Sequence, residues 1–388
     1  MTRTAAPAPY LFGPDEQPLF PGGPFAPRHT RARKAGYVLG ALVSGIAATL
    51  GNALVSVNAG TIAGDAGLYA AEAAWLPALF VGLNATANLF IIKARIQFGI
   101  QPVTQALVAA YALAALIQLL SPGFTVMIAV RAAGGIAAAA LTTIIIFDLV
   151  QVFPAKARPM ALAIAINITQ LGIPIARTFP VELLALGAWQ GLALIELALA
   201  LAALAMLNIV PLPPSRRGKA FEPLDFVTAA LAIPAFLLIA GVLAQGRLQW
   251  WLDAPWLGWM LAAAVPLLTA VILIERSRAN PLLRIDWLSS RLILRLALVA
   301  LLIRLALAEQ SYGSVGLLAA SGLTNDQLRT LFLLVALSMV LGTFVMVATF
   351  KPNRMRQQVL AATLVIAVAA WLDSHSSNLT RPEQLYLS

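Results

Sequence analysis

Apolar residues in this chain form long runs, and charged residues and prolines gather in the short stretches between them. Most runs are about 18–24 residues long, the length that an α-helix needs to cross roughly 30 Å of hydrocarbon. So many runs of this length are not expected in a soluble domain. The pattern predicts eleven membrane-spanning helices, at Tyr37–Val57, Ala74–Ile92, Val103–Leu120, Phe124–Phe147, Met160–Leu184, Gly191–Val210, Phe226–Ala244, Trp256–Ile274, Leu292–Leu307, Leu328–Phe350 and Val359–Trp371.

Composition indicates the same class of protein. Hydrophobic residues make up 60% of the 388 positions and charged residues only 11%. The mean hydropathy of +0.86 lies far above the range of soluble proteins. The apolar runs are too long for the strands of a membrane β-barrel. We therefore expect an all-α fold, a polytopic helical bundle in a membrane.

Breaks in the apolar pattern divide the chain into five parts. The N-terminal part is rich in Pro and Gly and is predicted to be disordered, and the longest later break is the polar stretch PLPPSRRGKAFEPLD. The predicted parts are a disordered cytoplasmic tail at 1–36, a first six-helix bundle at 37–210, a cytoplasmic linker at 211–225, two additional helices at 226–274 and a partial second bundle of three helices at 275–388.

Basic residues occur in alternate connections, as the positive-inside rule requires. The connection after Tyr37–Val57 carries Asp65 and Glu72 without Lys or Arg, whereas the next one carries Lys93 and Arg95. This alternation predicts a cytoplasmic N-terminus, in a chain compatible with a bacterial inner membrane. The net charge of +10 is scattered over these connections, so nucleic acid is not an expected partner.

Residue types limit the chemistry that is available. The chain has no cysteine and only two histidines, which excludes thiolate chemistry and argues against a histidine metal site. We find no nucleophile–base arrangement and no phosphate-binding glycine loop. We therefore expect neither an enzyme nor a cofactor.

Ionisable residues inside apolar runs are the first functional candidates, because each costs about 2.5–3.5 kcal/mol at the bilayer centre on insertion scales. Arg131 suits either a gating role beside a carboxylate or a structural one near the membrane interface. Glu196 is the acid placed well inside a predicted helix and is the candidate proton carrier. Asp148, at a helix end, is expected to pair with Lys156 or Arg158. Further pathway candidates are Asn52, Glu182, Arg304 and Glu309.

A polar stripe crosses one face of the predicted helix Met160–Leu184. Its members share that face at spacings of i, i+3, i+7 and i+10, and they are Asn167, Gln170, Pro174 and Arg177. Such a stripe is expected to line a water-filled pathway, with a bend at the proline. Arginine there would favour anionic substrates. Alternatively, Arg177 pairs with Glu182 or Glu196 and only holds the fold.

Several local sequences resemble the major facilitator superfamily, and within it the fourteen-helix drug:proton antiporter branch. They are LGNALVSV at 50–57 followed by TIA at 61–63, RAAGG at 131–135, GIP at 172–174 with the later Trp189, and, around the two additional helices, Asp225, Gln245, Trp251 and ERSRANPLL at 275–283. The resemblance implies a secondary transporter that works by alternating access.

The chain also departs from the patterns of that branch. Gly51 stands where the family's first helix carries an Asp, and the gating-loop candidates Lys93, Arg95 and Gly99 lack the family's acidic residue. If proton coupling persists, Glu196 is the better buried acid. The branch has three more helices after Trp371, so the sequence implies either a fragment or a truncated gene.

These observations lead to one expected function and one alternative. The expected function is proton-coupled export of small amphipathic compounds or drugs, with the lipid bilayer, protons and the substrate as partners and a periplasmic adaptor protein implied by family analogy. The alternative is a non-transporting remnant or membrane scaffold of the same family. An integral membrane enzyme is the least favoured class.

Overall fold

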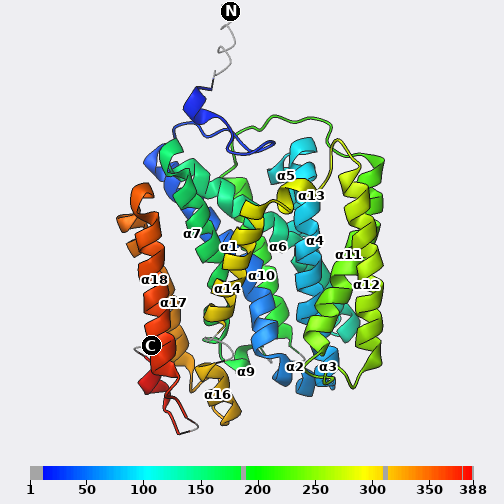
Figure 1. Ribbon diagram of the computed structural model, residues 1–388, viewed down its shortest axis with the longest axis vertical. Coiled ribbons are helices and arrows are strands. Elements are labelled where there is room, and N and C mark those ends of the chain that lie inside the picture. The colour runs from blue at the N-terminus through cyan, green and yellow to red at the C-terminus, as the bar shows by residue number, and fades with distance from the viewer. Residues whose placement is uncertain (1–11, 185–188, 309–312, 378, 387–388) are drawn as a thin grey trace, which may run out of the picture.

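The computed structural model describes residues 12–184, 189–308, 313–377 and 379–386, and the regular structure in these ranges is helical, without a β-strand (Figure 1). The helices are α1 Arg31–Val57, α2 Ala59–Asp65, α3 Ala70–Ala73, α4 Trp75–Gln97, α5 Ile100–Leu120, α6 Phe124–Val152, α7 Arg158–Gln170, α8 Gly172–Ala176, α9 Val181–Leu184, α10 Gln190–Ile209, α11 Pro223–Gln245, α12 Pro255–Arg276, α13 Ile285–Leu288, α14 Arg291–Leu307, α16 Ser314–Ala320, α17 Arg329–Thr349 and α18 Met355–Asp373. Short 3₁₀ helices lie at Pro14–Glu16, Ala155–Ala157, Pro352–Arg354 and Pro382–Leu385.

Ten helical segments in the described ranges are long and apolar enough to cross a membrane, and this confirms the predicted all-α class with many membrane-length helices. The predicted span Leu292–Leu307 is not among them. It forms α14, which has only 17 residues and carries Arg291, Arg295 and Arg304. Its short length and its three arginines make it less suited to cross a membrane than the ten longer helices. Ten such helices are typical of an integral membrane protein.

Burial is concentrated in the first bundle. Within their most apolar stretches, 72% of the residues of α6 and 61% of those of α1 are buried, compared with 11% for α17 and none for α18. The contact between α1, α6 and α10 consists largely of alanine, which allows the backbones to approach closely. The alanines concerned are Ala47, Ala48, Ala137, Ala138, Ala200 and Ala203.

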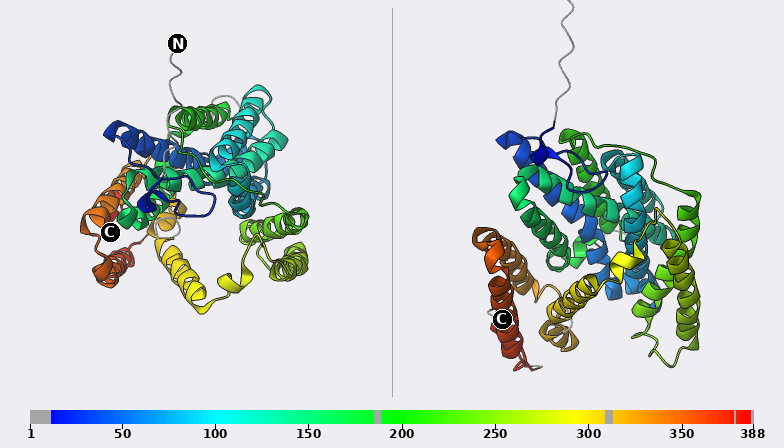
Figure 2. Two further views of the ribbon diagram at one scale, coloured as in Figure 1. Left: turned by 90° about the horizontal axis from the view of Figure 1, so that it is seen from above. Right: turned by 45° about the horizontal axis from the view of Figure 1, so that its top comes forward.

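The later helices flank this core on two sides. Seen from above, α11 and α12 stand together at one side of the first bundle, α17 and α18 stand at the other, and α14 lies between the two pairs (Figure 2). α11 and α12 pack against each other and α11 packs against α4, whereas α17 packs against α7 and α8. α11 begins at Pro223, inside the predicted linker 211–225.

The predicted span Met160–Leu184 is interrupted in the structure. α7 ends at Gln170, α8 begins at Gly172, and Arg177 caps α8. Pro174 has no backbone N–H and cannot donate to the carbonyl group four residues earlier, at Gln170. The interruption at Leu171 follows from this missing hydrogen bond.

Residues 12–30, here called the strap, fold back over one end of the first bundle, so the predicted disorder is wrong for them (Figure 1). Phe25 is buried, and its ring stacks on Phe12 at a centroid distance of 3.9 Å. The Gln151 amide donates to the Phe25 carbonyl oxygen at 3.1 Å. The Arg158 guanidinium donates to the Asp15 carbonyl oxygen at 2.7 Å. Buried aromatic rings and carbonyl groups bound by α6 and α7 thus hold the strap; residues 1–11 lie outside the described part.

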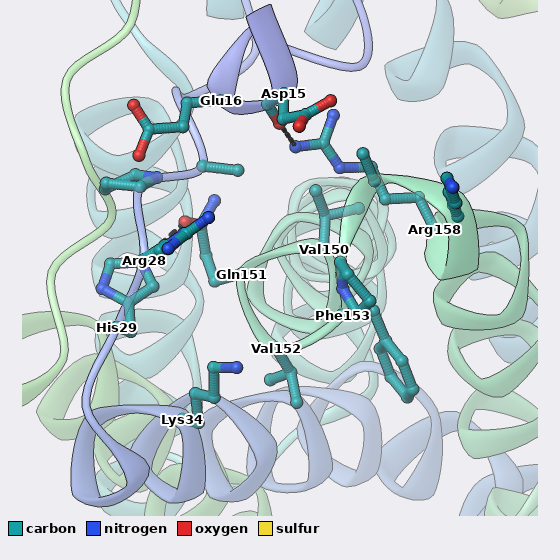
Figure 3. A pocket seen from close by; sticks show the side chains of 15 residues that line it. Asp15, Glu16, Arg28, His29, Lys34, Val150, Gln151, Val152, Phe153 and Arg158 are labelled. Atoms are coloured by element: carbon teal, nitrogen blue, oxygen red, sulfur yellow. Dashed lines mark hydrogen bonds between the residues drawn. The ribbon is translucent and has the colours of Figure 1, made fainter. Parts of the chain in front are cut away.

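A pocket of about 520 Å³ lies between the strap and the ends of α1, α6 and α7 (Figure 3). On the strap side, the His29 imidazole lies 2.9 Å from the Gln151 side-chain oxygen. Burial lowers the pKa of His29 below its usual 6.5, and the positive charges of Arg33 and Lys34 act in the same direction. The docked strap therefore favours the neutral imidazole.

We predict that the strap loosens as the pH falls below about 6.5. The docked His29 binds fewer protons than the released one, so docking is strongest above the ordinary pKa and weakens below it. Because the chain has no cysteine, a spin label on Pro21→Cys can report strap mobility between pH 5 and pH 8. His29→Gln should remove the increase in mobility at acid pH. Equal mobility at both ends of this range would contradict the prediction.

Candidate functional site

Arg131 and Glu196 form a buried ion pair inside the first bundle. An Nη of Arg131 on α6 donates to Oε1 of Glu196 on α10, and the two side chains are only 2% and 0% exposed. The second carboxylate oxygen, Oε2, is buried and has no hydrogen-bond partner among the described residues. The structure therefore pairs Glu196 with Arg131. The alternative from the sequence, a pair between Glu196 and Arg177, is not formed among the described residues. A buried pair of this kind is stable only while both charges remain matched.

The absence of a side chain at Gly51 makes room for Glu196. A Cβ atom placed on Gly51 would lie 2.5 Å from Oε1 of Glu196 and 3.0 Å from the Tyr111 hydroxyl. Tyr111, which is buried on α5, interacts with the Glu196 carboxylate through its hydroxyl. Gly51 is the position where the resemblance implies an Asp. In this chain the Glu196 carboxylate, from α10, occupies the space that an acidic side chain at position 51 would fill.

The next residue of α1 faces a different environment. Asn52 lines a cavity of about 300 Å³ on another side of the helix, and its side-chain oxygen is buried without a hydrogen-bond partner among the described residues. Half of the other lining residues carry uncharged polar side chains, and they are Thr49, Ser56, Asn84, Thr142, Thr169 and Gln170. The turn of α1 at 51–52 thus separates a buried ion pair from a polar cavity.

A second cavity, of about 390 Å³, lies where α7 and α8 of the first bundle face α14 and α17. The polar stripe leads into it, because Asn167, Gln170 and Pro174 all line this cavity. Arg304 of α14 lines it from the opposite side and donates to the Gln170 side-chain oxygen at 2.5 Å. Gln170 and Ile173 also border the first cavity. The two cavities therefore share two lining residues at the interruption between α7 and α8.

The fourth member of the stripe, Arg177, lies beside this second cavity. Its Nη1 donates to the Asn325 side-chain oxygen at 3.3 Å, and its guanidinium lies over the Phe332 ring at 4.7 Å from the centroid. Glu182 stands on the short helix α9 and is not among the residues that line either cavity. Glu309 lies outside the described residues.

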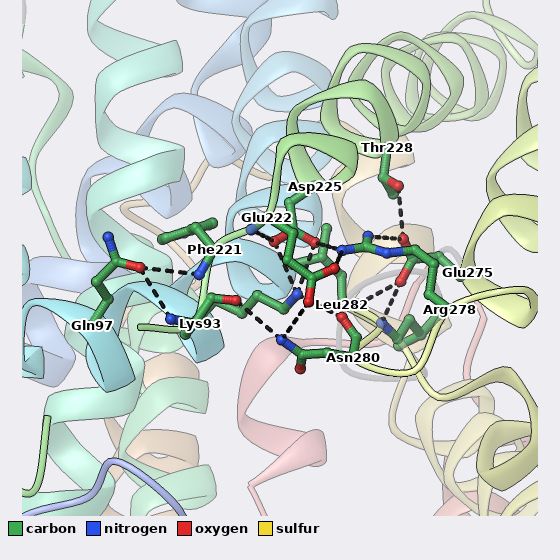
Figure 4. Close-up of polar contacts among 12 residues, drawn as sticks. Lys93, Gln97, Phe221, Glu222, Asp225, Thr228, Glu275, Arg278, Asn280 and Leu282 are labelled. Atoms are coloured by element: carbon green, nitrogen blue, oxygen red, sulfur yellow. Dashed lines mark hydrogen bonds and ion pairs between the residues drawn. The ribbon is translucent and has the colours of Figure 1, made fainter. Parts of the chain in front are cut away.

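A dense charge cluster attaches α11 and α12 to the end of α4 (Figure 4). The buried Lys93 ammonium donates to both carboxylate oxygens of Asp225, at 2.8 and 2.9 Å, and to the Asn280 carbonyl oxygen at 2.7 Å. Arg278 pairs with the same Asp225 at 2.7 Å and with Glu222 at 2.8 Å. The hydrogen bond from Arg278 lowers the pKa of Glu222. The cluster is a structural junction in which several charges share partners.

The other two gating-loop candidates also lie in packed surroundings. The Arg95 guanidinium lies over the rings of Phe20 and Phe147, at 5.9 and 5.7 Å from their centroids. Gly99 joins α4 to α5 with a φ of +89°, a conformation that favours glycine. Phe20 belongs to the strap, so the end of α4 is held by the strap on one side and by the charge cluster on the other.

The structure corrects the prediction for Asp148. This acid is buried on α6, only 5% exposed, and in the described part of the chain no ion pair joins it to Lys156 or Arg158. Arg158 instead donates to strap carbonyl groups. Asp148 faces α1, where a Cβ on Gly40 would lie 3.1 Å from its Oδ2. The position of Gly40, three helical turns before Gly51, places both buried acids against one side of α1.

Sequence reasoning did not single out Tyr111 or the partnership of Lys93, Asp225 and Arg278. A lone Tyr in an apolar run carries no local signal for its contact with Glu196. The sequence contains a partial signal for the cluster. Lys93 and Asp225 both stand at the ends of apolar runs, where an unpaired charge is costly. Their pairing spans 132 residues and needs the fold.

Comparisons with known proteins provide no family for this chain: no protein-family model matches it, and no curated protein shows significant sequence similarity to it.

We predict that Gly51→Ala destabilises the protein by about 1–3 kcal/mol, the usual cost of overpacking a filled site, because the new methyl group displaces the Glu196 carboxylate from Arg131. The matched control is Gly60→Ala on α2, where a Cβ meets nothing within 4 Å and a gain in helix propensity is expected. Thermal unfolding of the purified protein in detergent measures both. Equal unfolding temperatures for the two variants would contradict the role of Gly51.

Proposed function

We propose that this chain is a secondary transporter of the major facilitator type that exports small amphipathic compounds in exchange for protons. One observation carries the proposal: the buried acid–base pair of the first bundle stands near two cavities, one among the helices of that bundle and one at its interface with α14 and α17. Transporters place their substrate and coupling sites at such an interface. The ten membrane-length helices provide the setting.

The Glu196 carboxylate is the coupling group in this proposal. Its Oε1 accepts from Arg131, while Oε2 has no hydrogen-bond partner among the described residues. A proton taken up at Oε2 cancels the carboxylate charge and leaves the Arg131 cation without its counter-charge. Two protonation states with different internal electrostatics favour two different packings, and this difference drives alternating access.

α1 is the element that links this proton to the substrate. Gly51 contacts the ion pair, and Asn52 lines the cavity on another side of the same turn. A shift of α1 that follows protonation therefore changes both surroundings at once. Phe80 extends the link, because it lines the cavity and also lies against Gly134, next to Tyr111.

We further propose that the strap end of the bundle faces the cytoplasm, since the basic residues gather in the connections on that side. The charge cluster of Lys93, Asp225 and Arg278 then lies at the cytoplasmic surface. Lys93 makes a fixed contact here, because its partners are Asp225 on α11 and the Asn280 carbonyl oxygen in the segment after α12. Movement in this proposal falls to α1, α7 and α8.

We predict that Glu196→Gln removes the response of transport to a pH gradient. The amide has nearly the shape of the carboxylate but takes up no proton in this range, so downhill movement of substrate persists while accumulation stops. The assay uses proteoliposomes with an imposed pH gradient and two fluorescent probes, the cation ethidium and the anion 1-pyrenebutyrate.

Asp148→Asn is the matched control, because it removes a second buried carboxyl group of the same bundle that has no ion pair in the described part of the chain. This variant should keep pH-driven accumulation. If Glu196→Gln accumulates a probe as well as the unsubstituted protein does, Glu196 is not the coupling group. If neither probe moves in any variant, the non-transporting scaffold replaces the transporter.

A further inference from the structure

The cavity between α7, α8, α14 and α17 has the size and the wall of a site for a small organic molecule. Its volume of about 390 Å³ falls within the range of ligand pockets, which are mostly apolar with a few placed polar groups. The apolar part of the wall is formed by Ile166, Ile173, Leu307, Phe332, Val335 and Met339. The polar groups stand together at Asn167, Gln170 and Arg304.

The charge of this wall has one sign. Among the described residues that line the cavity, Arg304 is the ionisable one and none is Asp or Glu. Its guanidinium donates to the neutral Gln170 side chain, and within the described ranges no carboxylate lies within 4.0 Å of it. A guanidinium has five N–H donors, so an amide oxygen leaves most of them available for a ligand.

The apolar side of the cavity includes a buried aromatic ring. Phe332 of α17 is 2% exposed, and the Arg177 guanidinium lies over its ring at 4.7 Å. Contacts between a guanidinium and an aromatic face hold both groups in place. A ligand that fills the cavity therefore meets a positive group at Arg304 and an apolar wall that includes this ring.

We propose that the ligand of this cavity is an amphipathic organic anion, a carboxylate or sulfonate on a flat apolar body. The anionic head binds Arg304 in the geometry that a guanidinium offers to two oxygen atoms, and Gln170, released from Arg304 or bridging to it, supplies an amide N–H. The apolar body lies against Ile173 and Phe332. The inference rests on the proposed function, because it names the substrate class of the same site, but binding tests it without transport.

The experiment is a binding titration with three ligands that share one body and differ in head group: 1-pyrenebutyrate, its neutral amide and the corresponding pyrenylbutylammonium. The purified protein is held in nanodiscs of zwitterionic lipid, and empty nanodiscs provide the blank. We expect the anion to bind at least about tenfold more tightly than the amide or the ammonium. This is the preference expected from a charge-assisted hydrogen bond.

Variants on α14 assign the preference to one residue. Arg304→Met should weaken binding of the anion about tenfold and leave the amide nearly unchanged, while Arg304→Lys keeps part of the preference for the anion. Arg295→Met is the matched control, because Arg295 stands on the same exposed helix but does not line the cavity. Equal effects of Arg304→Met and Arg295→Met, or tighter binding of the ammonium ligand by the unsubstituted protein, would overturn the proposal.

The two proposals fail in different ways. Preferential binding of the anion without pH-driven accumulation of any probe leaves the ligand class standing and removes the transport function. Accumulation of ethidium under a pH gradient, together with no preference for the anion in the titration, keeps the transporter and removes the anionic substrate class.

Discussion

The ion pair between Arg131 and Glu196 is the interaction on which the rest of this structure depends. Two opposite charges buried at the contact of α6 and α10 are stable only if nothing separates them and no water competes. The alanine-rich contact around them and the bare Gly51 satisfy this requirement. α1 and α6 are therefore the most buried of the membrane-length helices, and the later helices are arranged around them. A second acid at position 51 would bring two carboxyl groups together in the same space.

In the proposed transporter, α1 links the proton site at this pair to the ligand. Gly51 lies against the pair, and Asn52 borders a cavity that shares Gln170 and Ile173 with the second cavity at Arg304. The charges at the strap end of the bundle form a cluster with a structural role. Lys93, Asp225 and Arg278 share hydrogen bonds within one cluster, so they fix the α11–α12 pair to α4. The molecule thus combines a hydrogen-bonded charge cluster at one end with cavities of mixed polar and apolar lining between its helices.

Much of the helical architecture could be predicted from the sequence, because the length and hydropathy of a run are local properties. The polar stripe was predictable for the same reason: Asn167, Gln170 and Pro174 share a helix face by spacing alone, and all three line one cavity. Pairings between distant helices could not be predicted. Arg131 and Glu196 are separated by 65 residues, and Asp148 looked paired only because Lys156 and Arg158 follow it closely. The prolines of the strap predict disorder, although Phe12, Phe20 and Phe25 supply the apolar surface that docks it.

The central claim is that the Glu196 carboxylate is the proton carrier of the proposed transporter. An acidic side chain at position 51 would otherwise have this role. Infrared difference spectroscopy of the carboxyl C=O stretch, recorded as the pH of the reconstituted protein is lowered, tests it most directly. The account predicts a band of a protonated buried carboxyl group that is present in the unsubstituted protein and in Asp148→Asn and is lost in Glu196→Gln. An unchanged band in Glu196→Gln would contradict it.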